Sequence, residues 1–265
     1  MIKTLTLFLI ASTAVKLSAI AQDTTYFNSS WQETTAKKAT YYRTKLKTDS
    51  GWQITDHFGS GNVQMKGFYT DDSLHIAQGD FAWYNDRGVP SHRCHYLKGK
   101  LEGTDTLYYL NGRKQVVGQN RAGDKQGEWI GYYPSGKISA KARFDKGQQI
   151  SASFYGEDGS ANKSATIFMK EATYPGGQPQ YLRFLNKTTR YPDSAVIHEI
   201  EGIVVVQFIV TKTGKISDLT VINSVDKYLD EEALRVMRLM IDWEPAIMGG
   251  IPTDTYHKQP IVFHL

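Results

Sequence analysis

Glycines recur every 24 residues through the middle of the chain, and this repeat constrains the fold more than any other feature. Three glycine series and one tyrosine series share the spacing: Gly79, Gly103, Gly127; Gly88, Gly112, Gly136; Gly99, Gly123, Gly147; and Tyr84, Tyr108, Tyr132. Phe58 with Gly61 begins the pattern, and Tyr155 with Gly159 ends it one residue short. Since an in-phase repeat indicates one structural unit per period, we expect a stack of similar units.

Each unit is predicted to be a β-hairpin. In the last full unit an aromatic segment, 129–133, leads into a Ser-Gly turn at Gly136, and a second strand, 137–144, ends at Gly147. Asn-Gly, Ser-Gly and Lys-Gly pairs allow the positive φ that tight hairpin turns require. A single hairpin is marginal in water, so the units must stack into a quasi-linear all-β array.

The segment Gly-Glu-Trp-Ile-Gly-Tyr-Tyr-Pro-Ser-Gly at 127–136 resembles the variant MORN repeat of bacterial exported proteins. The resemblance extends over residues 52–160, although Phe81 and Asp105 occupy the position of Trp129 in the earlier units. It implies an interaction or scaffolding surface with no known chemistry. We interpret the aromatic residues as core, and a binding face is the alternative.

The N-terminus has the pattern of a secretory signal peptide. A short positive start at Lys3 precedes a mostly apolar stretch, 4–15, and Ala19-Ile20-Ala21 supplies small residues before Gln22. We therefore predict cleavage after residue 21 and export to the periplasm. The alternative is an uncleaved anchor that associates the protein with the membrane. The apolar stretch is shorter than the ~20 residues of a membrane span.

Charge and cysteine content exclude two further classes. The chain has 31 Lys and Arg against 27 Asp and Glu, a net charge of +4, without a basic cluster, so we expect no nucleic-acid partner. Its one cysteine, Cys94, cannot form a disulfide within the chain.

After about residue 162 the glycine rhythm gives way to an α+β pattern. Helices are predicted at 178–188, with Tyr181, Leu182 and Leu185 on one side, and at 193–199; strands are predicted at 202–210 and 215–222. An amphipathic helix follows, capped by Asp226, with its apolar face formed by Leu229, Ala233, Val236, Met237 and Met240. A final strand is predicted at 259–265. One helix would thus cover a small antiparallel sheet, with Trp243 as a core residue.

This region resembles the C-terminal domain of the TonB energy transducer. The matching pieces, in order, are Tyr191-Pro192, the run 201–208, Gly214-Lys215-Ile216, the run 229–234, Trp243 with Pro245, and the run 260–263; Tyr174-Pro175-Gly176-Gly177 fits upstream. The resemblance covers residues 172–265 and implies an antiparallel sheet with one covering helix. The full set of expected segments is a signal peptide (1–21), a lead segment (22–51), the repeat domain (52–160), a linker (161–171) and this domain (172–265).

The TonB resemblance implies binding of a peptide from an outer-membrane transporter by β-augmentation, in which the peptide adds a strand to a sheet edge. The implied edge is the last strand, formed by Gln259, Pro260, Ile261, Val262, Phe263 and His264. TonB itself carries an inner-membrane helix and a Pro-rich spacer. This chain has 8 prolines, none clustered, so we expect a binding adaptor in which the repeats replace the spacer.

Two alternatives stay open. In the first, the protein is a structural envelope scaffold that forms a homodimer through its final strand. In the second, His92 and Cys94, on one face of a strand, contribute to a metal or nucleophile site. No phosphate loop, Gly-x-Ser-x-Gly or His-Glu-x-x-His motif is present, and Asp71-Asp72 and Glu231-Glu232 suit a turn and a helix start. We therefore expect no enzyme activity, cofactor or metal.

Overall fold

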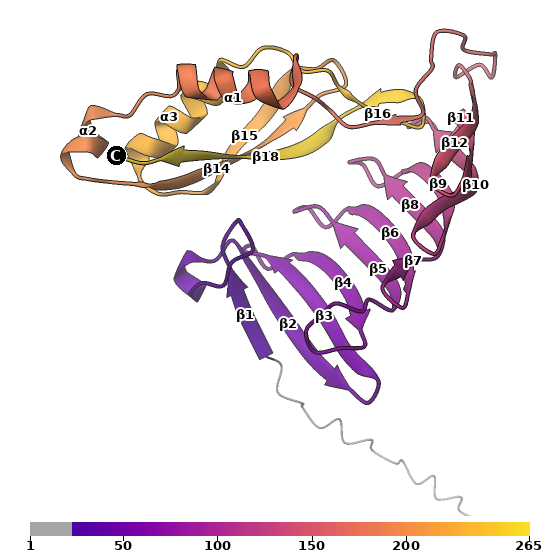
Figure 1. Ribbon diagram of the computed structural model, residues 1–265, viewed down its shortest axis with the longest axis horizontal. Coiled ribbons are helices and arrows are strands. Elements are labelled where there is room, and N and C mark those ends of the chain that lie inside the picture. The colour runs from indigo at the N-terminus through magenta and orange to yellow at the C-terminus, as the bar shows by residue number, and fades with distance from the viewer. Residues whose placement is uncertain (1–22) are drawn as a thin grey trace, which may run out of the picture.

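The computed structural model describes residues 23–265, so the predicted signal peptide lies outside the described residues. Residues 23–154 form one antiparallel sheet of twelve strands, called the repeat sheet (Figure 1). A short 3-10 helix, η1 (Ala36–Lys38), lies between the first two strands. The strands are β1 (Asp23–Phe27), β2 (Tyr41–Thr48), β3 (Gly51–Phe58), β4 (Val63–Tyr69), β5 (Gly79–Tyr84), β6 (Pro90–Leu97), β7 (Lys100–Leu101), β8 (Gly103–Tyr108), β9 (Lys114–Arg121), β10 (Asp124–Tyr132), β11 (Ile138–Asp145) and β12 (Gln148–Phe154).

The predicted hairpins are confirmed, and consecutive strands pair in sequence order apart from the short β7, which pairs only with β6. The lead segment contributes β1 and β2 to the same sheet. At one row of turns two adjacent residues have positive φ: Lys98-Gly99, Ala122-Gly123 and Lys146-Gly147. Two positive φ values in succession define the type I′ turn, whose twist matches that of the flanking strands.

Small residues beneath large aromatic rings fix the packing inside the repeat sheet. Trp129 is 1% exposed and covers Gly118, where an added Cβ atom would lie 2.0 Å from the indole ring. Phe81 covers Gly67 in the same way, with 2.1 Å to the phenyl ring. Phe81 and Trp129 are therefore core, as predicted, whereas the repeat tyrosines Tyr84, Tyr108 and Tyr132 are only half-buried. Each ring bridges neighbouring strands, so a unit is complete only when its neighbour is present.

After a connecting segment, 155–168, residues 169–265 form the C-terminal unit. Its three-stranded sheet has the order β15-β14-β18, and a second three-stranded sheet has the order β13-β16-β17. The elements are β13 (Met169–Lys170), α1 (Gly177–Thr188), α2 (Asp193–Ile197), β14 (Gly202–Val210), β15 (Ile216–Asn223), α3 (Lys227–Arg238), β16 (Ala246–Met248), β17 (Ile251–Thr253) and β18 (Thr255–Phe263).

The predicted elements of this unit are present, but the second sheet was not predicted, and the bounds and packing of some elements differ from the prediction. The final strand begins at Thr255, four residues earlier than predicted, because polar residues 255–258 still pair with β14. Leu182 is 47% exposed, so only Tyr181 and Leu185 of the predicted apolar side enter the core. Two helices, α1 and α3, contribute to that core where one was expected. The cap was predicted correctly: the Asp226 carboxylate accepts a 2.8 Å hydrogen bond from the backbone N–H of Tyr228.

The C-terminal unit lies across the strand ends of the repeat sheet (Figure 1). Helices α1 and α3 cover the face of the β15-β14-β18 sheet that points away from the repeats, and the other face points toward them. On the covered face Val204, Val206 and Phe208 are fully buried with the helices. The alternation of β14 side chains thus separates a helix side from a repeat side.

Two groups of contacts hold the unit on the repeat sheet. At one end, Lys258 donates a hydrogen bond to the Tyr41 hydroxyl. At the other, the Ser139 hydroxyl donates to the carbonyl of Gly249 at 2.7 Å, and the Gln115 amide donates to the Thr253 hydroxyl at 2.7 Å. The last two contacts are buried, where a hydrogen bond that is lost costs about 1–3 kcal/mol.

Candidate functional site

Strand β18 is an edge strand. It pairs with β14 along its whole length, from Thr255 opposite Val210 to Phe263 opposite Gly202, and no second strand pairs with it among residues 23–265. An edge strand offers a row of unpaired backbone groups to any extended chain that approaches it. Five of the six predicted edge residues, 259–263, therefore lie in this edge strand. The sixth, His264, lies just past its end.

Side chains of β18 alternate between core and solvent in a way that holds the edge in place. Ile261 and Phe263 are buried among the helices, and the Phe263 ring meets Tyr191 edge-on with 5.8 Å between centroids. Val262, between them, is 63% exposed. The strand is thus anchored by one face, while its other face and its free edge stay open near Val262.

Pro260 determines which backbone groups reach the free edge. A proline has no N–H to give to the ladder, so it fits where its backbone groups point away from the paired strand. Pro260 lies opposite Val205, and its carbonyl accepts a 2.6 Å hydrogen bond from the side-chain amide of Gln259. By the two-residue period, Lys258 and Val262 point their N–H groups to the same free edge. The edge thus offers donors on both sides of Pro260 and none at Pro260 itself.

The end of the strand is tied to the start of β14. Glu201 accepts a 2.5 Å hydrogen bond from the backbone N–H of Leu265 and lies 2.7 Å from Nδ1 of His264. The hydrogen bond from Leu265 is the main reason why the pKa of the Glu201 carboxyl is lowered, with the nearby His264 adding to it. His264 is therefore occupied by a contact within the unit rather than directed at the free edge.

Trp243 lies where helix α1, strand β14 and strand β18 meet. Its ring contacts Tyr181 at 5.4 Å, Phe208 at 5.7 Å and His257 at 5.5 Å between centroids. The burial of His257 lowers the pKa of its imidazole, an effect partly opposed by the charge of Glu171. Trp243 thus packs against the core as predicted, and it connects the edge strand to α1 and β14.

The predicted alternative around Cys94 is packed into the repeat sheet. Cys94 is buried, and burial, followed by the charge of Asp105, raises the pKa of its thiol to about 12, so the thiolate that a nucleophile or metal ligand requires does not form at neutral pH. His92 Nε2 lies 2.7 Å from Asp105, whose second oxygen accepts a 2.7 Å hydrogen bond from Asn120. Across residues 23–265 no group of three or more His, Cys, Asp or Glu could hold a metal ion. Asp105, at the position of Trp129, is thus held by polar partners in place of ring packing.

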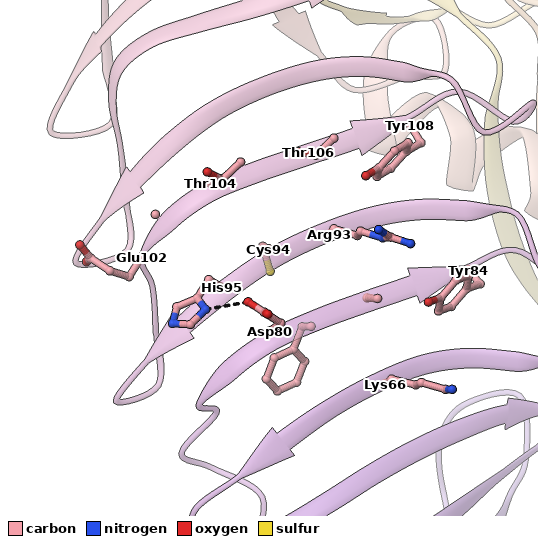
Figure 2. A pocket seen from close by; sticks show the side chains of 13 residues that line it. Lys66, Asp80, Tyr84, Arg93, Cys94, His95, Glu102, Thr104, Thr106 and Tyr108 are labelled. Atoms are coloured by element: carbon pink, nitrogen blue, oxygen red, sulfur yellow. Dashed lines mark hydrogen bonds and ion pairs between the residues drawn. The ribbon is translucent and has the colours of Figure 1, made fainter.

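Strands β4, β5, β6 and β8 also line an open groove of about 680 Å³ (Figure 2). His95 Nδ1 pairs there with Asp80 at 2.8 Å, and the Arg93 guanidinium lies over the Tyr108 ring at 5.9 Å. Figure 2 shows Lys66 apart from both groups. His95, Asp80 and Arg93 are thus engaged by neighbours on the sheet, and the charged side chains do not converge on one point.

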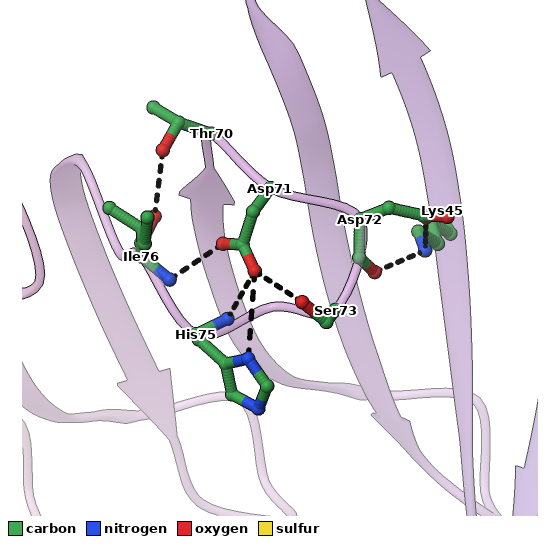
Figure 3. Close-up of polar contacts among 7 residues, drawn as sticks. All are labelled: Lys45, Thr70, Asp71, Asp72, Ser73, His75 and Ile76. Carbon is green, nitrogen blue, oxygen red and sulfur yellow. Dashed lines mark hydrogen bonds and ion pairs between the residues drawn. The ribbon is translucent and has the colours of Figure 1, made fainter.

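The Asp71-Asp72 pair forms the predicted turn between β4 and β5 (Figure 3). The Asp71 carboxylate accepts hydrogen bonds from the backbone N–H groups of His75 (3.0 Å) and Ile76 (2.6 Å) and from the Ser73 hydroxyl (2.7 Å). These bonds, that from His75 first, lower the pKa of Asp71 to about 2. Asp72 pairs with Lys45 of β2. The two carboxylates therefore stabilise a loop.

No helix formed by residues 23–265 combines the length and the apolar character needed to cross a membrane. A comparison with curated protein sequences finds no match to this chain. Among solved structures, the chain is similar to the NMR solution structure of the Helicobacter pylori TonB C-terminal domain. The two are 25% identical over 34% of this chain and 86% of that one, with a TM-score of 0.25.

The family model of the Gram-negative bacterial TonB protein C-terminal matches residues 187–265. The match begins at the end of α1 and includes α2, β14, β15, α3 and β18, the elements that build the edge described above. Residues 187–265 therefore form a domain of the TonB C-terminal family, and this family supports a protein-binding role for the domain in the Gram-negative cell envelope.

Proposed function

We propose that the C-terminal unit binds an extended peptide of an outer-membrane transporter by β-augmentation on β18, as an adaptor in TonB-dependent transport. The unpaired edge of β18, within a domain of the TonB C-terminal family, is the observation that supports this proposal most directly. Backbone hydrogen bonds would supply the affinity, and side chains near Val262 would supply selectivity. The repeat sheet then acts as the scaffold that holds this domain, in keeping with the MORN-like pattern.

The test removes one hydrogen-bond donor from the free edge. Val262→Pro deletes the N–H that we assign to this edge, and Val262→Thr keeps it with a side chain of similar shape. Binding of fluorescent peptides from the N-termini of outer-membrane transporters would be measured by anisotropy on the whole chain. We expect Val262→Pro to weaken binding by about fivefold to tenfold, the value of one hydrogen bond, and Val262→Thr to retain it.

The outcome that refutes the proposal is equal binding by both variants, or no binding at millimolar peptide. Circular dichroism confirms that the variants are folded. An intact β18 with no peptide affinity would favour the alternative, a structural scaffold in which the same edge pairs with a second copy. Sedimentation separates the two, because a homodimer dissociates on dilution and is lost in Val262→Pro without any peptide.

We also propose that the protein acts in the periplasm after cleavage of residues 1–21. The support is the three-part pattern of the N-terminus together with the Gram-negative family of the C-terminal domain. N-terminal sequencing of the protein isolated from its own cells should begin at Gln22. A chain that keeps Met1 in the membrane fraction would instead indicate an uncleaved anchor.

A further inference from the structure

A cavity of about 380 Å³ lies between the first half of β18 and the strand ends of the repeat sheet. Residues 255–258 of β18 form one wall, and Tyr84, Leu107 and Tyr108 of the repeats form the facing wall. The volume falls within the ~300–1,000 Å³ of small-ligand sites, toward the lower end. It can hold one long side chain with its backbone at the rim.

The cavity lies on the side of β18 that points toward the repeats. Lys258 reaches Tyr41 on this side, and Gln207 of β14, the partner of Lys258 in the sheet, also lines the cavity. His257, by contrast, stacks on Phe208 on the helix side, with 5.6 Å between ring centroids. Since alternate residues of a strand point to the same face, a strand added to β18 would send every second side chain to the side where the cavity lies.

Contacts on both sides of the cavity keep its walls apart at a fixed distance. Lys258 bonds to the Tyr41 hydroxyl and lies 4.7 Å from the centre of its ring. The buried bond from Gln115 to Thr253 closes the other side. A peptide that pairs with this part of β18 would therefore place every second side chain next to this space and the repeat sheet.

The charged groups around the cavity favour a cation. Three carboxylates, Asp86, Glu171 and Asp254, line it against one ammonium group, that of Lys258, which Tyr41 already engages. Asp254 accepts a 2.6 Å hydrogen bond from the backbone of Lys212. Within the described chain the side chains of Asp86 and Glu171 have no hydrogen-bond or ion-pair partner. Two unengaged carboxylates beside tyrosine rings suit an alkyl chain that ends in a positive charge.

We propose that this cavity accepts a lysine or arginine side chain of the peptide that pairs with β18, so that the repeat sheet and the C-terminal unit recognise one ligand together. This inference rests on the proposed function, because the peptide backbone is what brings the side chain to the cavity. The repeat sheet would then contribute directly to the choice of peptide. A partner segment would accordingly alternate apolar or hydroxyl residues with a basic residue at one end.

The test uses three blocked heptapeptides and the whole chain. All share the core Thr-Val-Thr-Val-Thr, and both ends are lysine, norleucine or glutamate, so the strand direction does not matter. We expect the lysine peptide to bind about fivefold more tightly than the norleucine peptide at moderate salt, the size of an exposed charge contact with a cation–π contribution. The glutamate peptide should bind most weakly, and added salt should reduce the differences.

A double variant locates the preference. Asp86→Asn with Glu171→Gln should abolish the lysine preference and leave the norleucine peptide unaffected. The matched control, Asp49→Asn with Asp242→Asn, changes the net charge equally at exposed positions outside the cavity and should keep the preference.

Equal binding of all three peptides, or a lysine preference that survives in the double variant, overturns this inference and leaves the β18 proposal in place. Binding by none of the peptides, together with no effect of Val262→Pro on transporter peptides, overturns both.

Discussion

The repeat sheet and the C-terminal unit are stabilised in different ways. The repeat sheet has two small core clusters, one around Phe81 and one around Trp129. The C-terminal unit has one continuous core that joins both long helices to the three-stranded sheet. In a stacked array, apolar surface is buried only where adjacent units touch. In a sheet covered by helices, the apolar surface of a whole face is buried.

Buried polar groups show the same contrast. Among residues 23–265, six of the eight buried polar or charged residues belong to the repeat sheet: Asp56, Asp105, Thr106, Gln115, Asn120 and Ser139; the other two are Glu232 and Thr253. Several make specific bonds, such as Asp56 with Arg43 at 2.6 Å. The thin core of the array thus depends on paired polar groups, and the C-terminal unit depends on apolar area.

The largest expected effect comes from removing the central ring of the repeat sheet. Trp129→Ala leaves a cavity over Gly118 and deletes the 3.1 Å hydrogen bond from the indole N–H to the Gln119 carbonyl. We expect a loss of about 3–5 kcal/mol in the free energy of unfolding, measured by urea denaturation. Hydrogen exchange should accelerate in β9–β11 while α3 stays protected. Uniform acceleration across both regions would show that they unfold as one unit and would break the comparison.

The next effect tests the contact between the two regions. A Cβ atom added at Gly131 would lie 2.4 Å from the Cα atom of Gly249, so Gly131→Ala must push the C-terminal unit away from β10. We expect a loss of about 1–3 kcal/mol, the usual cost of overpacking, read from the denaturation midpoint. Gly156→Ala is the matched control, because its new Cβ atom would meet only the exposed side chains of Asp158 and Ser160, which can move. Equal midpoints for the two variants would mean that docking contributes little to stability.

A smaller effect concerns the C-terminal unit alone. Asp226→Ala removes the cap of α3 and should cost about 1 kcal/mol, whereas Asp226→Asn keeps a side-chain acceptor and should cost less. Thermal unfolding followed by circular dichroism measures both. Helical residues of α3, and not the repeat strands, should lose hydrogen-exchange protection. An effect spread over the repeats would contradict the separate cores.

The smallest effect is the pH dependence at the edge. Burial lowers the pKa of His257 in the folded state, so the unfolded chain takes up its proton first as the pH falls. The contribution of the neutral His257 ring to the free energy of unfolding is fully present above the ordinary histidine pKa of about 6.5. It is lost as the pH falls from there toward the lowered pKa of the folded state. His257→Gln should make the urea midpoint depend less on pH between pH 7.5 and 5.5. The substitution His198→Gln, at an exposed position, should leave that dependence unchanged. Identical slopes for both would refute the assignment.

The sequence predicted most of the local structure for a physical reason. A 24-residue period places glycines at the turns, and positive φ at a turn is a property of the residue and its neighbours. The same holds for the cap at Asp226 and for strand 202–210, which the structure places at the predicted bounds. The edge formed by residues 259–263 was accessible only through the resemblance to TonB, because no local pattern tells an edge strand from an internal one.

Other features depend on segments that are distant in the chain. The close approach of Gly131 to Gly249, the bond from Lys258 to Tyr41 and the cavity beside Tyr256 join residues more than a hundred positions apart. Their side chains are ordinary in their own segments. By itself, the sequence determined the hairpins, the cap of α3 and the order of the main helices and strands, because each depends on short-range conformational preference and periodicity. Only the tertiary structure decided where the two regions meet and which part of β18 stays open, because packing between distant surfaces sets both.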